Sequence, residues 1–219
     1  MRRLFAWFRR PPPPLNGFLR DVETVLHVGA NLGQERDEYA ALGLNVIWVE
    51  PIPSVFEELQ ARLEGFPKQR AYRALISDCD GARRVLHVAN NGGASSSILE
   101  LAEHRSIWPD VHYTHDLELD TTTLSTLVRA HGIELRGRTA LVLDTQGSEL
   151  LILKGAADQL ERFRYIKTEA ADFNAYQGCC TLAQITSFLK PAGFRLRQAT
   201  PFISRPGTGT YFDVLYARK

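Results

Sequence analysis

The fold is decided by residues 24–33, which read Thr24-Val25-Leu26-His27-Val28-Gly29-Ala30-Asn31-Leu32-Gly33. An apolar strand, residues 24–28, runs directly into a glycine-bearing turn, and the residues after it predict a helix over about 34–42. Glycine lets a backbone come close to a ligand, and free N–H groups at the start of a helix favour an anionic group. A turn of ordinary geometry would carry the same glycines, so this stretch indicates a ligand site only together with other features.

Short β-type runs alternate with helical segments along the chain. Core strands are expected at residues 24–28, 45–49, 71–76, 139–143 and 164–168, with helices at 34–42, 54–63, 148–153, 156–160 and 182–189. Strands at 83–89 and 115–119 and a helix at 123–130 interrupt this alternation, and strands at 194–199 and 211–217 form a closing antiparallel hairpin. The order predicts an α/β protein with a Rossmann-like, mostly parallel seven-stranded sheet and helices on both faces.

Residues 1–20 differ in composition from the rest of the 219-residue chain. Arginines alternate with bulky apolar residues up to Arg10, and prolines occupy residues 11–14. The apolar stretch is too short and too interrupted for the core of a signal peptide. We therefore expect a basic, proline-rich segment at residues 1–20 and one folded domain at 21–219. Residues 1–10 are either a leader packed loosely on the domain or a basic amphipathic anchor in weak contact with an anionic membrane surface or with a partner.

The overall composition excludes several classes of protein. A formal net charge of +1 gives no general attraction to nucleic acid, so no such partner is expected. No apolar run reaches the roughly 18 residues of a membrane-spanning helix. The three cysteines, two of them adjacent at Cys179 and Cys180, match neither a disulfide framework nor a CxxC zinc site. A cytoplasmic location is expected, and no feature indicates an oligomeric state.

An acid, Glu50, stands at the end of the second predicted strand, twenty-one positions after Gly29. In Rossmann-like sheets an acid at this place binds the ribose hydroxyls of an adenosine cofactor. The dinucleotide pattern G-x-G-x-x-G is incomplete here, and no Gly-Lys-Ser/Thr of a P-loop follows. These features favour S-adenosylmethionine (SAM), which carries no phosphate. Ser77-Asp78, after the third strand, is a candidate for the adenine amine, although an aspartate-rich turn would present the same residues.

Several motifs together resemble the FkbM-type methyltransferases. They are Gly29-Ala30-Asn31-Leu32-Gly33, Val49-Glu50-Pro51, Ile76-Ser77-Asp78, Ser95-Ser96-Ser97, Leu143-Asp144-Thr145-Gln146-Gly147-Ser148-Glu149-Leu150, Leu153-Lys154-Gly155-Ala156, Tyr176-Gln177-Gly178 and Ala192-Gly193-Phe194. The resemblance covers residue 24 to the C-terminus. It implies a SAM-binding class I methyltransferase fold for residues 21–219 and, most often, O-methylation of sugars, glycans or polyketide-like natural products. Many members carry a glutamate where this chain has Gln146, so any metal-binding or basic role of that acid is missing here.

The carboxyl ends of the strands should hold the site, because open α/β sheets bind their ligands there. The candidate cofactor-binding residues are His27, Gly29, Ala30, Asn31, Gly33, Glu50, Pro51, Ser77, Asp78, Asp144 and Thr145. Asp144 is also the leading catalytic candidate, since its charge would favour a sulfonium and it could take a proton from a hydroxyl. The alternative is that Asp144 only caps the next helix. Glu169 is a second candidate base, or else an ordinary acid at a strand end.

Three histidines, His104, His112 and His115, cluster between the third and fourth core strands. Histidine accepts protons near neutral pH, so His115 is a further catalytic candidate. No pattern of carboxylates or cysteines completes a metal site around them, and none is expected. Glu149 either serves the site or caps the backbone N–H groups at the start of its helix.

We therefore expect a SAM-dependent methyltransferase that modifies a hydroxyl of a small-molecule, sugar or glycan acceptor. One alternative is an NAD(P)-dependent oxidoreductase on a similar sheet, against which the missing glycine argues. The other is a non-catalytic Rossmann-like binding module. The presence of Gly29, Glu50, Asp78 and Asp144 in one chain argues against lost cofactor binding.

Overall fold

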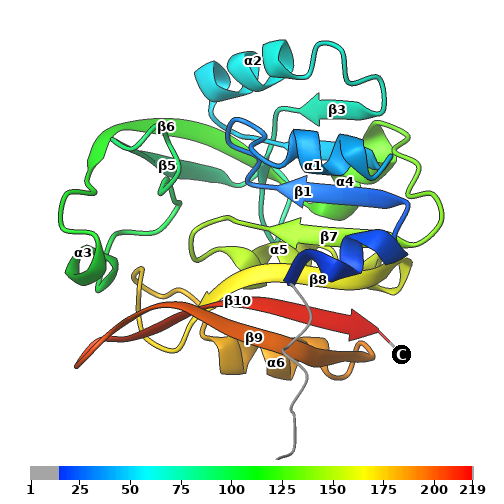
Figure 1. Cartoon of the computed structure of the whole chain (residues 1–219). Coiled ribbons are helices and arrows are strands. Elements are labelled where there is room, and N and C mark those ends of the chain that lie inside the picture. Colours follow the sequence, from blue (N-terminus) through cyan, green and yellow to red (C-terminus); the bar gives the residue numbers. More distant parts are fainter. Residues whose placement is uncertain (1–14, 219) are drawn as a thin grey trace, which may run out of the picture.

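The computed structural model describes residues 15–218. Its main sheet has seven strands in the order β3-β2-β1-β7-β8-β10-β9. Their bounds, in that order, are Gln69–Tyr72, Asn45–Val49, Thr24–Val28, Thr139–Leu143, Phe163–Ala171, Gly209–Arg218 and Phe194–Arg205. The pairings from β3 across to β8 are parallel, whereas β10 is antiparallel to both β8 and β9 (Figure 1). The structure confirms the predicted sheet and its C-terminal hairpin.

Helices cover both faces of this sheet. All five residues of β1 are buried, and successive side chains of a strand point to opposite faces. Leu26 and Val28 pack in the core that includes residues of α4, α5 and α6, while Val25 packs in the core that includes residues of the 3-10 helix η1 and of α1 and α2. These elements are η1 Leu15–Asp21, α1 Arg36–Ala41, α2 Pro53–Arg62, α4 Leu124–Ala130, α5 Glu149–Gly155 and α6 Leu182–Leu189.

A second sheet, in the order β4-β6-β5, stands beside the carboxyl ends of β1 and β7 (Figure 1). It consists of β4 Leu75–Ile76, β6 Tyr113–Thr122 and β5 Arg83–Ala89, and the short α3 His104–Ile107 lies between β5 and β6 in the chain. Leu75, Leu86 and Val88 of this sheet form a small core with Ile52, which precedes α2. The second sheet is thereby fixed over the end of the main sheet where ligands are expected.

The single strand predicted at residues 71–76 is wrong, because this stretch contributes to two sheets. β3 pairs with β2, and after a break at residues 73–74 β4 pairs with β6. The predicted helix at 156–160 is also wrong: a turn there leads into the 3-10 helix η2 Leu160–Arg162. The sequence did not predict α3 or η1, since neither is long enough to show a clear helical period.

Residues 15–20, which the sequence grouped with the N-terminal segment, pack on the main domain. Phe18 and Leu19 of η1 are buried, and the Phe18 ring lies 5.5 Å from that of Tyr165 on β8. Residues 1–14 lie outside the described part of the chain, and with them the membrane contact expected of residues 1–10. Among residues 15–218, no helix is long and apolar enough to cross a membrane.

Candidate functional site

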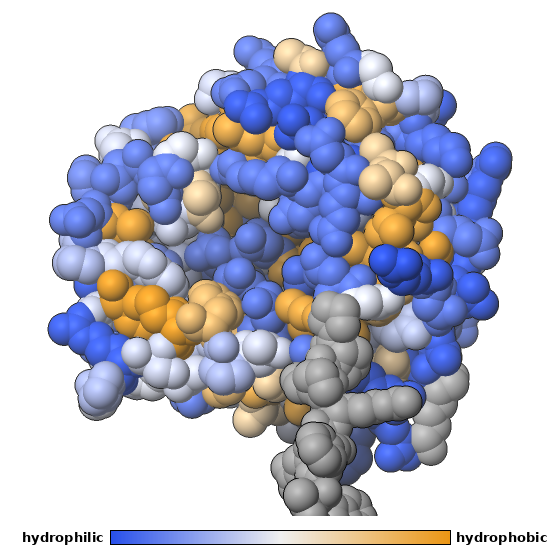
Figure 2. All heavy atoms as spheres, viewed as in Figure 1, coloured by the Kyte–Doolittle hydropathy of each residue, from blue (hydrophilic) through white to orange (hydrophobic). Residues whose placement is uncertain are grey.

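A cavity of about 300 Å³ opens at the carboxyl ends of β1, β2 and β7, beside the second sheet. Figure 2 shows a hollow on this face of the molecule, between the side that carries β5 and β6 and the side of the main sheet. The residues that line the cavity include His27, Val28, Gly29, Ala30, Asn31, Glu50, Pro51, Ile52, Ala74, Leu75, Ile76, Leu86, Ser96, Ser97, Asp144, Thr145 and Gln146. This is the place where open α/β sheets bind ligands.

The glycine turn is held between the two neighbouring strands. The N–H groups of Gly29 and Ala30 both donate to the carbonyl of Val49, at 3.0 and 3.1 Å. Gly29 has a φ of +82°, and a Cβ on it would lie 1.8 Å from the backbone oxygen of Asp144. No other residue fits there, because the left-handed conformation and the close approach both require glycine. The turn after β1 and the acid after β7 are therefore in direct backbone contact.

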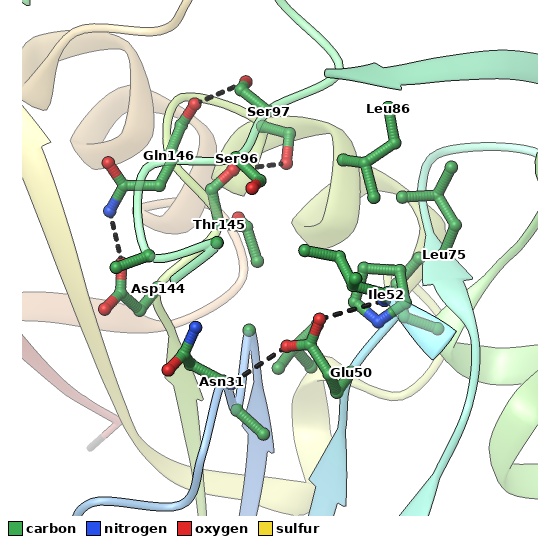
Figure 3. A pocket seen from close by; sticks show the side chains of 18 of the residues that line it. Asn31, Glu50, Ile52, Leu75, Leu86, Ser96, Ser97, Asp144, Thr145 and Gln146 are labelled. Carbon is green, nitrogen blue, oxygen red and sulfur yellow. Dashed lines mark hydrogen bonds between the residues drawn. The ribbon is translucent and has the colours of Figure 1, made fainter. Parts of the chain in front are cut away.

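Glu50 is buried at the end of β2, with both carboxylate oxygens engaged (Figure 3). Oε2 accepts from the backbone N–H of Asn31 and Oε1 from that of Ile52, each at 2.9 Å. Burial raises the pKa of Glu50 to about 7, although these two hydrogen bonds oppose the shift. A carboxylate has about four lone-pair positions, so two remain for the hydroxyl groups of a ligand in the cavity.

Asp144 is held by the side chain of Gln146 on the opposite wall of the cavity (Figure 3). Gln146 has a φ of +53°, and its amide nitrogen donates to Oδ1 of Asp144 at 2.6 Å. The hydroxyl of Tyr176 donates to Oε1 of Gln146, and that of Ser97 donates to its backbone oxygen, both at 2.7 Å. Burial raises the pKa of Asp144, and the hydrogen bond from Gln146 opposes this. Gln146 therefore links Asp144 to Ser97, which lies in the loop after β5 on the side of the second sheet.

Glu149, the first residue of α5, holds the loop that leads into this helix. Its Oε1 accepts from the backbone N–H groups of Thr145 and Gly147, at 3.2 and 3.1 Å, and the side chain is buried. These donors lie in the loop before the helix, and α5 has no side-chain capping bond at its N-cap residue Ser148, so the structure does not bear out the capping interpretation of Glu149. Asp144 does not cap the helix either, because its carboxylate is bonded by the Gln146 side chain.

Glu169 lies in a second, narrow recess that shares Gln146 with the cavity. On the sheet it stands opposite Asp213 of β10. Burial raises the pKa of Glu169, and the carboxylates of Asp144 and Asp213 raise it further. Asp144 and Glu169 thus disfavour each other's ionisation across the boundary between the two spaces.

The structure brings eight of the predicted site residues together around the cavity, places Glu169 in the adjoining recess, and leaves four outside both spaces. His27, Gly29, Ala30, Asn31, Glu50, Pro51, Asp144 and Thr145 line the cavity. Gly33, Ser77, Asp78 and His115 do not. Ser77 is buried with its carbonyl against Gly155, Asp78 is exposed, and the cavity wall on that side is Ala74, Leu75 and Ile76.

The two histidine candidates have different surroundings. His115 is exposed on β6, where its Nδ1 is 3.0 Å from the hydroxyl of Thr114. His27 is stacked on Trp48 with ring centroids 4.9 Å apart, and burial lowers its pKa to about 3. It is therefore a neutral, packed side chain at the back of the cavity. Among the described residues, no group of three histidine, cysteine or acidic side chains is arranged to hold a metal.

Sequence reasoning missed the part of the wall that comes from the second sheet. Leu86, Ser96, Ser97 and Ile98 reach the cavity from β5 and the loop after it. Only the serine run gave a signal, as one of the motifs of the family resemblance. The position of the apolar residues depends on how β5 folds back on β6, which no local pattern specifies.

The model of the FkbM methyltransferase domain matches residues 27–196. The chain belongs to the FkbM methyltransferase family. A relative, the 2-O-methyltransferase NoeI of Sinorhizobium fredii (strain NBRC 101917 / NGR234), is 25% identical over 196 residues, which cover 86% of this chain and 75% of that protein. Membership confirms the predicted methyltransferase and leaves the oxidoreductase alternative without support.

Two solved structures show the same fold at very low identity. The METTL16 methyltransferase domain has a TM-score of 0.53 at 10% identity, covering 94% of this chain and 65% of that one. TrmK of M. capricolum, in complex with S-adenosylhomocysteine (SAH), has a TM-score of 0.51 at 5% identity, covering 94% and 67%. This chain spans about two thirds of the length of either structure. The similarity confirms the predicted class I methyltransferase fold.

Proposed function

We propose that this protein is a SAM-dependent O-methyltransferase acting on a hydroxyl of a sugar, glycan or natural-product acceptor. The observation that carries the proposal is that one cavity joins the Gly29 turn, the buried Glu50 after β2 and Asp144 after β7. Membership of the FkbM family supports methyl transfer, and the name of the relative NoeI supports oxygen as the accepting atom.

The residues of the cavity fit the parts of SAM. The free lone pairs of Glu50 suit the two ribose hydroxyls, and the backbone at Gly29 and Ala30 allows close approach of the amino-acid end. Ile52, Leu75 and Leu86 form an apolar wall suited to a flat adenine ring. Asp78 lies outside the cavity and so cannot contact the adenine amine as the sequence suggested. We assign adenine binding to this apolar wall instead.

SAM supplies a methyl group on a positively charged sulfur, so that the oxygen–methyl bond forms as the sulfur–methyl bond breaks and the electron pair returns to sulfur. Asp144 provides a negative charge beside this position, which favours a cation in a buried site. Glu169, in the adjoining recess, accepts the proton of the acceptor hydroxyl. With SAM bound, its cation near Asp144 would offset the repulsion between the two acids and lower the pKa of Glu169, so that Glu169 could serve as the base. His115 has no part in this scheme, since it is exposed and outside both spaces.

Calorimetry with SAM, SAH and NADH tests the cofactor, and transfer of a labelled methyl group from SAM to a panel of sugars, phenols, amines and carboxylic acids tests the acceptor. The expected result is binding of SAM and SAH but not NADH, and a methyl ether as product. Binding of NADH in place of SAM would contradict the cofactor. Methylamine or methyl ester products alone would contradict O-methylation of a hydroxyl.

A further inference from the structure

The second recess differs from the cofactor cavity in size and chemistry. Its volume is only about 20 Å³, and its wall includes Gln146, Glu169, Tyr176 and Tyr211. A water molecule needs roughly 10–15 Å³ of such space. The recess therefore admits hydroxyl groups at the edge of a ring but not the ring itself. Because it shares Gln146 with the cavity, a group bound in it lies next to Asp144.

A buried histidine stands behind this recess. His104 of α3 is 3% exposed, and its ring packs against Trp108 at 4.5 Å and Tyr176 at 4.9 Å. Its Nδ1 lies 2.8 Å from the hydroxyl of Tyr211, whereas its Nε2 is buried with no hydrogen-bond partner among the described residues. Burial lowers the pKa of His104 to about 4, so the ring is neutral and carries a single proton at physiological pH.

The unpartnered nitrogen determines which atom carries that proton. A proton on Nε2 would leave a buried N–H donor without an acceptor, and such orphaned donors are rare in folded proteins. With the proton on Nδ1, only a lone pair is left without a partner. In this tautomer His104 donates to the oxygen of Tyr211, so the hydroxyl proton of Tyr211 remains free for another acceptor. Burial raises the pKa of Tyr211, and Cys179, Glu169 and Glu149 raise it further, which keeps this hydroxyl protonated.

The recess thus combines an available hydroxyl donor with two acids, Glu169 and Glu149, and Oε1 of Glu149 is already engaged by the backbone of Thr145 and Gly147. Tyr176 is already committed to Gln146, so Tyr211 is the tyrosine whose proton is available. The described contacts give the carboxylate oxygens of Glu169 no hydrogen bond from another side chain or from the backbone. A donor and an acceptor on adjacent walls are complementary to two neighbouring oxygens on one molecule.

We propose that this recess is the acceptor subsite and that it selects a ring with vicinal oxygens, as in a pyranose: Glu169 holds the hydroxyl to be methylated, Tyr211 donates to the oxygen beside it, and His104 is the positioning residue that orients Tyr211. This inference rests on the proposed function, since it assigns the acceptor side of the same site.

The test compares Tyr211→Phe and His104→Phe with Tyr113→Phe in the full chain. Tyr113 is a matched control, because it packs in the same aromatic cluster but donates its hydroxyl to the backbone oxygen of Leu99. The probes are methyl pyranosides that carry a hydroxyl beside the methylated position and their deoxy analogues. Titration into protein saturated with SAH measures binding, and methyl transfer from SAM measures kcat and KM separately.

The wild-type protein and the Tyr113 variant should prefer the hydroxylated pyranoside to its deoxy analogue by about tenfold, as expected for a hydrogen bond. Tyr211→Phe and His104→Phe should abolish that preference by raising KM for the hydroxylated probe, with kcat and SAH affinity changed less than twofold. Nitrogen-15 NMR of wild-type His104 should find the proton on Nδ1. Unchanged discrimination in both variants, or no pyranoside binding to the SAH-saturated protein, would overturn the inference. Absence of methyl transfer despite discriminating pyranoside binding would instead count against the proposed function alone.

Discussion

The side-chain amide of Gln146 donates a 2.6 Å hydrogen bond to Oδ1 of Asp144. Replacing Gln146 by glutamate would put a second acid against a carboxylate whose pKa burial has already raised. Like charges at this separation repel strongly, so the two acids should share one proton at neutral pH and the negative charge should no longer stand on Asp144 alone. We expect Gln146→Glu to lower kcat at pH 7 at least tenfold and to move the pH–rate profile to higher pH.

Gln146→Met is the control, since it removes the hydrogen bond without adding charge. It should lower kcat without producing the same shift of the pH profile. If the glutamate variant kept the wild-type profile, the charge of Asp144 would not act in the reaction.

Glu50 should make both folding and cofactor binding depend on pH. Its pKa is about 7 in the folded chain, against an ordinary value near 4.5. As pH rises from 4.5 to 7, Glu50 ionises in the unfolded chain before it ionises in the folded one. The free energy of unfolding therefore falls over this interval, by roughly 3 kcal/mol in all, from its value below pH 4.5. In urea unfolding, the free energy of unfolding of Glu50→Gln should fall less between pH 5 and pH 8 than that of the wild-type protein, because the contribution of Glu50 is gone.

The same variant should weaken SAH binding at pH 8 by tenfold or more, because a neutral amide is a poorer acceptor for two ribose hydroxyls. Wild-type affinity should fall as pH drops below about 7, and the affinity of Glu50→Gln should change less. Equal affinity of the two proteins at pH 8 would remove Glu50 from the ribose assignment.

The strands of the main sheet were predictable from sequence because they carry long apolar runs between turn residues. The bounds of β1, β2 and β7 agree with the prediction, and Gly29, Glu50 and Asp144 follow from their places at the strand ends. The acceptor side was not predictable. His104 was grouped with exposed histidines, yet it is buried through contacts with Tyr176 and Tyr211, which lie far away in sequence. Long-range packing of this kind leaves no periodic signal.

Gly155 explains the glycine of the Leu-Lys-Gly-Ala motif as a packing requirement. A Cβ at this position would lie 2.1 Å from the backbone oxygen of Ser77. Gly155→Ala should therefore destabilise the protein by about 3 kcal/mol, the upper end for overpacking, even though alanine has the better helix propensity. Urea denaturation measures the loss, with Lys154→Ala as the control. A stabilised Gly155→Ala variant would show that α5 can move away from Ser77 without cost.

The N-terminal boundary of the folded unit should lie before η1. A chain that begins at Leu15 should bind SAH like the full-length protein, because the described walls of the cavity come from residues 27–152. A chain that begins at Val22 loses Phe18 and Leu19, both buried, and should be less stable by about 4 kcal/mol or more. Calorimetric binding and thermal unfolding of the two truncations test this. If the chain that begins at Leu15 is well folded but binds SAH weakly, part of residues 1–14 belongs to the site.

Asp144→Asn separates the charge of this residue from its shape. Asparagine keeps an oxygen that can accept from Gln146, and Glu149 holds the loop before α5 independently of Asp144, so the fold should not suffer. Stability at pH 8 should even increase, because a buried carboxylate with a raised pKa is replaced by a neutral group. Turnover should nevertheless fall by about a hundredfold or more, the usual effect of losing an electrostatic or acid–base group. Methyl transfer, SAM affinity and urea unfolding are measured on the same variant. Near-normal turnover would exclude a role for the charge in the chemical step, whereas lost affinity with preserved turnover at saturation would make Asp144 a cofactor-binding residue alone.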